Sequence, residues 1–293
     1  MPPKGNFDRF LSSLLTRESG LDPAKFPWYV RNHDSRVMRY PQVTAPGRPV
    51  RNLHLGTLET QELTVAEYFC SIGVNDLFDS SDGTCIAAMQ YRVVNALGFT
   101  GYQIGESILI VTGHYLPECV DTTIDGVCAR CERYYCAPLD AATWANGCRE
   151  QFCHIPSSPR PVVCTDTNTW RGTFTGKDNV WTHDDLKSPT NQERVIRTII
   201  DTNFAQIVRQ LDDRNMVLPD VIGDPHVCRP FPDLPCIQLH CTLSGLLAAA
   251  HLCGTAAVVD FLDSGALTCD EFGTPMWKYL LEFSNYSTPY DDP

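Results

Sequence analysis

The clearest pattern in the chain is an apolar stripe with helical spacing between residues 188 and 213. Ser188 and Pro189 stand where a helix begins, with proline in its first turn. The same spacing predicts a first helix at about 6–19 with one buried face. The stripe of the long helix consists of Val195, Ile196, Ile199, Ile200, Phe204, Ile207, Val208 and Leu211.

Shorter periodic segments predict further helices. Thr64 precedes an apolar run and Glu67 follows three residues later, which is a capping box. Residues 85–98 have helical spacing, and 102–115 form an apolar helix or a buried segment. Two close-packed helices occupy 241–265, broken near Gly254 and stopped by Gly265. Residues 274–283 form a last short helix.

Other stretches lack periodicity. Prolines interrupt residues 22–62, a cysteine-rich stretch covers 117–169, and a proline-rich loop covers 223–236. Alternation typical of strands is scarce in all of them. The sequence therefore predicts a mainly α fold with irregular, disulfide-rich insertions.

Composition narrows the class of protein. The 293 residues are 43% apolar and 20% charged, which is typical of an ordinary globular chain with ample core. No run of about 18 apolar residues exists, so we expect no membrane insertion. The net charge is −12 with no basic block, which argues against nucleic acid binding. The N-terminal apolar stretch is too short for a signal peptide, so a secreted form would have a mature N-terminus here.

The cysteines indicate an oxidising compartment. Seven of the 14 lie between residues 119 and 164, and this density predicts disulfide bonds in a secreted protein. Asn285 begins a glycosylation sequon, Asn-Tyr-Ser. The alternative is zinc, because Cys128-x-x-Cys131 has ligand spacing. No second Cys-x-x-Cys is present, so disulfides are favoured and we expect no metal site.

Glu18 is the first candidate for chemistry. It lies in "LLTRESGLDPAKF", at the buried edge of the first helix and just before residues that stop it. A carboxylate at such an edge is costly unless it is paired or used. It is either a simple helix end or a general acid with a raised pKa.

Several motifs together resemble those of lysozyme-like proteins. "RESGLDP" resembles the Glu-Ser-Gly-x-x-Pro motif of lytic transglycosylases and goose-type lysozymes, and "NALGFTGYQIGE" is similar to their second motif. "WRGTFTGKDNV", "SGLLAAAHLCGTAAVVDFL" and "GTPMWKYLLEF" resemble segments of lysozyme-like proteins from phages and bacteria. The resemblance implies one lysozyme-like helical domain over residues 1–293, with insertions at about 24–88 and 117–169.

The resemblance also implies roles for individual residues. Glu18 would be the general acid and Glu106 a second catalytic carboxylate, although Glu106 equally fits a charge at a helix start. Substrate contacts would come from Tyr102, Gln103, Thr175 and Asp178. Thr175 and Asp178 also fit an ordinary tight turn. Trp28, Trp170 and Trp181 either pack in the core or stack on sugars, and His251 reads as a core residue.

Two functions from different classes remain open at this point. One is a secreted, monomeric, cofactor-free glycosidase or lytic transglycosylase acting on peptidoglycan or a chitin-like polymer. The other is a repurposed lysozyme-like scaffold in a secreted animal protein. That scaffold would be a matrix or binding protein, or a cofactor-free oxidative enzyme such as a luciferase acting on a small molecule. For the first function we expect Glu18 and Gln103 to face one common cleft.

Overall fold

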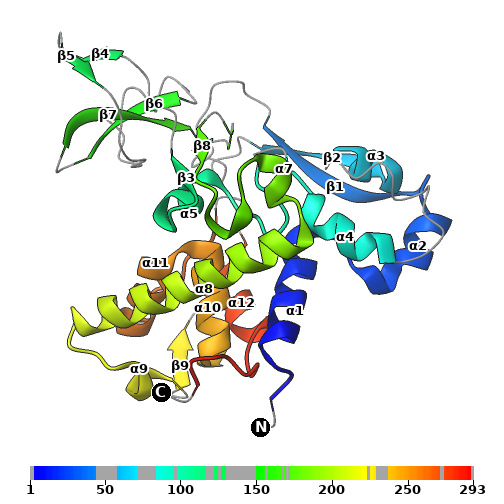
Figure 1. Cartoon of the computed structure of the whole chain (residues 1–293). Helices are drawn as coiled ribbons and strands as arrows, with labels where there is room; N and C mark the ends of the chain where they lie inside the picture. The colour runs from blue at the N-terminus through cyan, green and yellow to red at the C-terminus, as the bar shows by residue number, and fades with distance from the viewer. Residues whose placement is uncertain are drawn as a thin grey trace. The chain divides into compact units, whose positions relative to one another are not determined.

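The computed structural model describes residues 3–43, 58–71, 84–95, 98–116, 122–124, 127–129, 150–155, 158–165, 168, 170, 172–222, 225–228, 237–270 and 274–291. These residues are mainly helical (Figure 1). They group into a terminal unit, Met1–Leu15 with Arg197–Pro293, and a central unit, Thr16–Ile196. Within the described ranges, every helix is too short or too polar to cross a membrane.

The terminal unit is helical with one short hairpin. It holds most of α1 (Phe7–Ser19) and of α8 (Pro189–Asp212), both of which continue into the central unit. Its other elements are α9 (Leu218–Val221), β9 (Pro225–Cys228), β10 (Ile237–His240), α10 (Leu243–Cys253), α11 (Thr255–Ser264) and α12 (Met276–Glu282). Strands β9 and β10 pair antiparallel. The sequence predicted only a proline-rich loop at residues 223–236 and gave no sign of this pairing.

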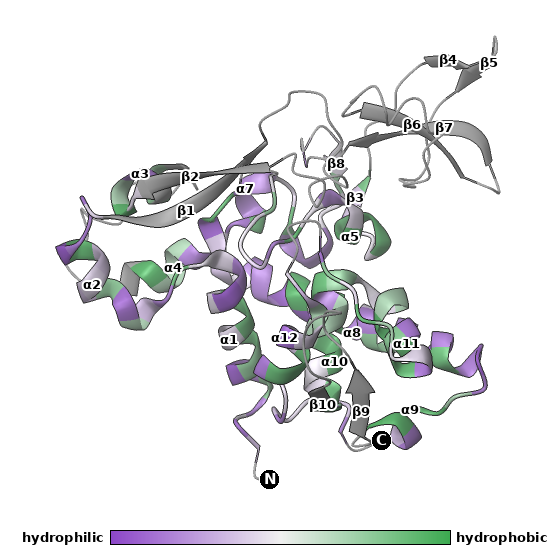
Figure 2. Ribbon diagram, turned by 180° about the vertical axis from the view of Figure 1, so that it is seen from behind, coloured by the Kyte–Doolittle hydropathy of each residue, from purple (hydrophilic) through white to green (hydrophobic). Residues whose placement is uncertain are grey.

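Helix α10 is the core of the terminal unit, and its ribbon is largely apolar (Figure 2). It packs against both α11 and α12. A Cβ at Gly245 would lie 2.7 Å from the carbonyl oxygen of Leu280, so only glycine allows α10 and α12 to approach this closely. Gly254 separates α10 from α11, and Gly265 ends α11 with a φ of 72°. The predicted break and stop are therefore confirmed.

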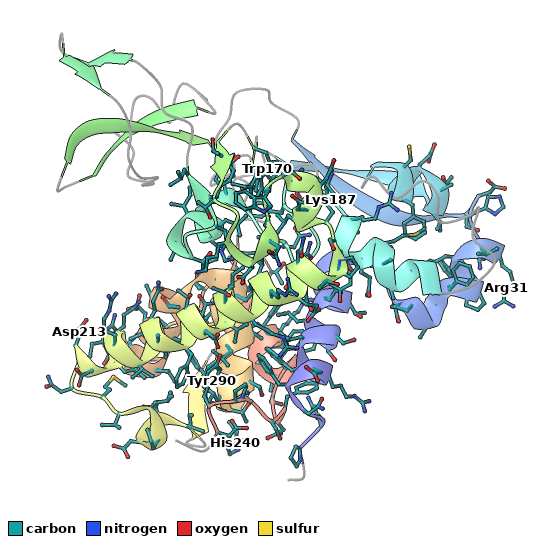
Figure 3. All side chains as sticks on the ribbon, in the orientation of Figure 1. Arg31, Trp170, Lys187, Asp213, His240 and Tyr290 are labelled. Carbon is teal, nitrogen blue, oxygen red and sulfur yellow. The ribbon has the colours of Figure 1, made fainter. Side chains whose placement is uncertain are left out.

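The two ends of the chain meet in the terminal unit. The amide of Lys4 donates to the carbonyl of Asn285 at 2.6 Å. Phe10 packs edge-on against Phe283, with ring centroids 5.9 Å apart. Further along, the ring of Phe204 stacks on that of Tyr290, with centroids 4.2 Å apart. Tyr290 is labelled in Figure 3. Aromatic contacts thus hold the C-terminal segment onto the helices.

The central unit mixes short helices with small antiparallel hairpins. Its helical elements are η1 (Pro23–Lys25), α2 (Phe26–Arg31), α3 (Val65–Ser71), α4 (Thr84–Arg92), α5 (Glu106–Val111), η4 (Lys177–Asn179) and α7 (His183–Leu186). The paired strands are β1 (Arg36–Val43) with β2 (Leu58–Thr64), and β3 (Tyr115–Leu116) with β8 (Thr173–Phe174). Two further hairpins are β4 (Thr122–Ile124) with β5 (Val127–Ala129), and β6 (Glu150–Ile155) with β7 (Ser158–Thr165).

Two stretches expected to be irregular contain regular structure. Residues 22–62 include η1, α2 and the hairpin β1–β2, and residues 117–169 include β4–β5 and β6–β7. Strand β1 carries Pro41 and several polar residues, so it has no clean alternation of apolar and polar positions. Its pairing with β2 sets the local structure, and a single-segment pattern cannot reveal that pairing.

The segment between α4 and α5 also differs from the expectation. Helix α4 ends at Arg92 rather than near residue 98, and α5 begins only at Glu106. Isolated antiparallel bridges join Val94 to Thr100 and Thr100 to Ile104. This tight double turn carries the "GFTGYQIGE" motif.

Candidate active site

Glu18 sits in the last turn of α1, and its residue is half-buried. The helix stops because Gly20 adopts a φ of 68°, a left-handed conformation that glycine accepts without strain. The hydroxyl of Ser19 then accepts the amide of Leu21 at 3.2 Å. Asp22 caps η1 by accepting the amide of Ala24 at 3.0 Å. The motif residues after Glu18 therefore end α1 and form a hydrogen-bonded turn that leads into η1.

Gln103 brings the second motif to the end of α1. Its side-chain Nε2 donates to the backbone carbonyl oxygen of Glu18 at 3.0 Å. The side-chain amide of Asn95 donates to Gln103 Oε1 at 2.5 Å. Gln103 has a φ of 58°, a left-handed conformation that costs a non-glycine residue roughly 1–3 kcal/mol. The two motifs, 85 residues apart in sequence, thus meet in the central unit.

A buried glutamine fastens α4 to the same turn. Gln90 is almost fully buried, and its Nε2 donates to the carbonyl of Leu21 at 2.7 Å and to the hydroxyl of Thr16 at 3.1 Å. Removing the amide would leave the Leu21 carbonyl without this buried donor. Gln90 was not singled out from the sequence, because its partners lie about 70 residues away.

Gly101 allows the second motif to fold against α8. It has a φ of 55°, and a Cβ there would lie 1.9 Å from Gln192 Oε1. That same oxygen accepts the amide of Tyr102 at 3.2 Å, while Gln192 Nε2 donates to the carbonyl of Leu186 at 2.7 Å. A glycine at this position is therefore required by both conformation and space.

Tyr102 has no solvent-exposed surface in the structure. Its hydroxyl donates to Glu193 Oε1 at 2.6 Å, and the hydroxyl of Tyr91 donates to the same oxygen at 2.8 Å. Burial, followed by the hydrogen bond to Glu193, raises the pKa of Tyr91. Tyr102 thus has a structural partner where the sequence predicted a substrate contact, and that contact stays a prediction.

Glu106 is the first residue of α5 and is only 8% exposed. The backbone amide of Trp170 donates to Glu106 Oε1, and the amide of Glu106 donates to Asn168 Oδ1 at 2.7 Å. A carboxylate in the first turn also interacts favourably with the helix dipole. This is the helix-start position that the sequence offered as the alternative, and a catalytic role for Glu106 stays a prediction.

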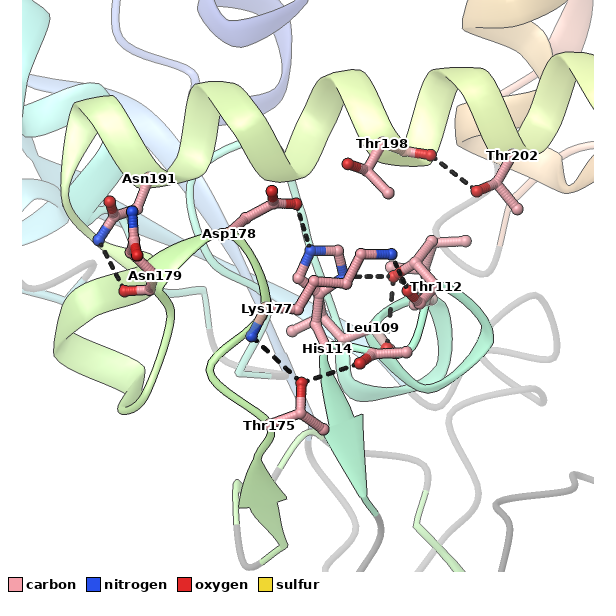
Figure 4. A network of polar contacts seen from close by, with 12 residues as sticks. Leu109, Thr112, His114, Thr175, Lys177, Asp178, Asn179, Asn191, Thr198 and Thr202 are labelled. Carbon is pink, nitrogen blue, oxygen red and sulfur yellow. Dashed lines mark hydrogen bonds and ion pairs between the residues drawn. The ribbon is translucent and has the colours of Figure 1, made fainter.

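Asp178 accepts a hydrogen bond from His114, a residue that the sequence analysis did not identify as a candidate. His114 is fully buried, and its Nε2 lies 2.8 Å from Asp178 Oδ2 (Figure 4). Burial lowers the pKa of His114, while the hydrogen bond to Asp178 opposes this effect. A neutral imidazole has one N–H, and a carboxylate only accepts, so we assign the proton to Nε2. The Thr112 hydroxyl lies 2.7 Å from Nδ1 and donates to the carbonyl of Ile108 at 2.9 Å.

Thr175 and Lys177 complete this network (Figure 4). The Thr175 hydroxyl donates to the carbonyl of Gly113 at 2.9 Å, and Lys177 Nζ donates to the carbonyl of Thr112 at 2.6 Å. Both residues are nevertheless exposed, and the side chain of Asp178 is 26% exposed. The loop is therefore clamped to the end of α5, with part of its polar surface facing solvent.

His183 and Trp170 form a second histidine site in the central unit. The rings stack at 4.5 Å with an interplanar angle of 21°, and His183 Nε2 lies 2.8 Å from the Thr100 hydroxyl. Burial lowers the pKa of His183 to about 4, the positive charge of Lys187 adds to this, and Asp184 opposes it. Trp170 thus packs in an aromatic cluster, as the sequence allowed.

The structure tests the cysteine predictions only in part. Cys70 and Cys269 are exposed, free thiols. The prediction that the cysteines form disulfide bonds is therefore wrong at these two positions. Cys131, the second cysteine of the Cys128-x-x-Cys131 spacing, lies outside the described residues. Among the residues that are described, no group of three or more His, Cys, Asp or Glu side chains is arranged to hold a metal ion.

Comparison with known proteins adds no relative. No family of known proteins, no curated protein and no solved structure matches this chain.

Proposed function

We propose that this chain cleaves β-linked amino-sugar polymers, of the peptidoglycan or chitin-like class, with Glu18 as the general acid. The observation that carries the proposal is the 3.0 Å hydrogen bond from Gln103 Nε2 to the Glu18 carbonyl. It joins the two segments whose sequences resemble the acid motif and the substrate motif of lysozyme-like proteins. The half-buried position of Glu18 at a rigid helix end also suits a proton donor.

In the proposed reaction, the Glu18 carboxyl gives its proton to the glycosidic oxygen as the bond to the anomeric carbon breaks. The oxocarbenium-like centre is then attacked by water, which gives hydrolysis, or by a hydroxyl of the same sugar, which gives an anhydro product. In either case the attacking oxygen gives its proton to the Glu18 carboxylate, which restores the acid. Gln103 fixes the backbone at Glu18, and Asn95 fixes the Gln103 amide. Such positioning matters because small displacements of a catalytic group are costly in rate.

A specific observation favours the alternative, a scaffold that no longer cleaves sugar. Glycosidases of the usual kind use two carboxyl groups. Here Glu106 accepts the Trp170 amide, Asp178 accepts from His114, and Glu193 accepts from two tyrosines. These three carboxylates thus have structural partners, which suits a binding protein or an oxidative enzyme acting on a small molecule.

The test compares Glu18→Gln with the wild-type chain on bacterial cell walls and on chitin oligosaccharides. Gln keeps the shape but carries no transferable proton, so product release should fall about 100-fold or more. Glu282→Gln is the matched control, because Glu282 also lies at the end of a helix, α12, and is exposed. Full activity in Glu18→Gln, or a wild-type chain that releases no product from either substrate, would favour the repurposed scaffold.

A further inference from the structure

We propose that the indole of Trp181 is a binding platform for one sugar ring of a glycan. Trp181 lies in the loop between β8 and α7 of the central unit (Figure 1). The inference rests on the proposed function for the class of glycan, but it concerns binding and not cleavage.

Trp181 presents more of its surface to solvent than any other large apolar side chain in the described ranges. It is 66% exposed, whereas Trp28 is 38% exposed and Trp170 is packed against His183. Val180, its neighbour in sequence, is fully buried. Next to Trp181 in sequence, the exposed apolar surface is therefore the indole alone, and the other strongly exposed apolar residues of the central unit, Val111 and Leu116, lie on α5 and β3.

The ring is held in place from below. A Cβ on Gly176 would lie 2.3–2.5 Å from three carbons of the six-membered ring, so the indole rests directly on that glycine. The amide of Trp181 donates to Asp185 Oδ2 at 3.1 Å. Asp185 and Thr182 also form a capping box that starts α7. Because the ring is fixed before a ligand arrives, little ordering cost would remain on binding.

The supporting loop is strained and strongly tethered. Gly176, Asp178 and Asn179 have φ values of 83°, 54° and 64°. Non-glycine residues in this left-handed region are strained, and such strain clusters at functional sites. Several hydrogen bonds hold the loop, among them the Asp178–His114 bond, the Lys177–Thr112 bond, and the bond of 3.3 Å from the Asn191 side chain to the Asn179 carbonyl.

The surroundings of the ring favour a sugar over a protein. Thr175, Lys177 and Asn179 are exposed polar residues on the same loop, suited to hydroxyl and acetamido groups. The C–H bonds on one face of a pyranose carry partial positive charge and match the negative face of an indole. A stable protein interface needs roughly 800 Å² on each partner, far more than one ring offers.

The test is a calorimetric titration with the tetramer of β-1,4-linked N-acetylglucosamine, in a Glu18→Gln background so that turnover does not interfere. Trp181→Ala should raise the dissociation constant about tenfold, and Trp181→Tyr should restore most of the affinity because an aromatic face is retained. Trp28→Ala is the matched control and should bind like the parent. A Trp181→Ala affinity equal to the parent, or a parent that does not bind, overturns the platform.

A second readout covers the case in which Trp181→Ala does not fold. The indole Nε1–H resonance of Trp181 should shift on titration of the folded parent, and an unshifted resonance overturns the proposal.

The outcomes also separate the binding platform from the proposed function. Trp181-dependent binding without cleavage by the wild-type chain supports the platform and contradicts the proposed function. Glu18-dependent cleavage with no effect of Trp181→Ala on binding contradicts the platform alone.

Discussion

His183 should make the central unit sensitive to mild acid. Its imidazole is half-buried against Trp170, and its pKa falls from 6.5 to about 4, chiefly through burial. Between these two pH values the unfolded chain binds a proton at His183 and the folded chain does not. Stability therefore rises with pH through this window and is lost as pH falls from 6.5 towards 4.

The size of the effect follows from linkage. The difference between 6.5 and about 4, multiplied by about 1.36 kcal/mol per pH unit, gives roughly 3 kcal/mol at pH 4. This is a large part of the 5–15 kcal/mol, roughly, that stabilises a typical domain. His114 acts in the same direction, because burial lowers its pKa too. A variant is therefore needed to isolate His183.

His183→Gln places an amide near the Nε2 position that bonds Thr100, and it does not titrate. The free energy of unfolding, from urea titrations followed by circular dichroism, would be measured from pH 7 to pH 4. The wild-type chain should lose about 3 kcal/mol more than the variant over this range. His33→Gln is the control for replacing a histidine by glutamine at an exposed position. Parallel curves for wild type and His183→Gln would refute the reasoning.

Two further predictions concern Gly101 and the cysteines. Gly101→Ala should destabilise by about 2 kcal/mol or more in urea unfolding, because the methyl group would collide with Gln192. Gly113→Ala is the control, because Gly113 also has a positive φ but no atom lies within 4 Å of the new Cβ. It should cost only about 1–2 kcal/mol. Equal losses of stability in the two variants would contradict the packing argument. Cys70 and Cys269 should react with a thiol reagent in the folded, unreduced chain, whereas no reactive thiol would contradict the structure.

Local signals were sufficient to predict the main helices. The apolar stripe of α8, the stops at Gly254 and Gly265, and the Thr64–Glu67 capping box all appear as predicted. In the capping box, the Thr64 amide donates to Glu67 Oε2 at 2.7 Å and the Glu67 amide to Thr64 Oγ1 at 3.1 Å. Each of these features depends on residues within a few positions of one another.

Long-range pairing could not be predicted in this way. Strand β1 forms because it pairs with β2. The hydroxyl of Tyr102 bonds Glu193, which is 91 residues away in sequence. His114 meets Asp178 across 64 residues, and nothing in "TGHY" distinguishes it from an exposed histidine. Asn95 was within the quoted "NALGFTGYQIGE" motif, but its bond to Gln103 depends on the tight turn between them. Sequence motifs therefore indicated that the segments of Glu18 and Gln103 lie close together, but not the residues that support them, and a common cleft for the two side chains stays a prediction.

The most direct test of the central proposal asks whether Glu18 donates a proton to the leaving group. Glu18→Gln and wild type would be compared on two chitobiosides, one with a sugar leaving group and one with a dinitrophenyl group, which departs without protonation. The account predicts a loss of about 100-fold or more on the sugar substrate and a much smaller loss on the dinitrophenyl substrate. Equal losses on both substrates, or no loss on either, would contradict a general-acid role for Glu18.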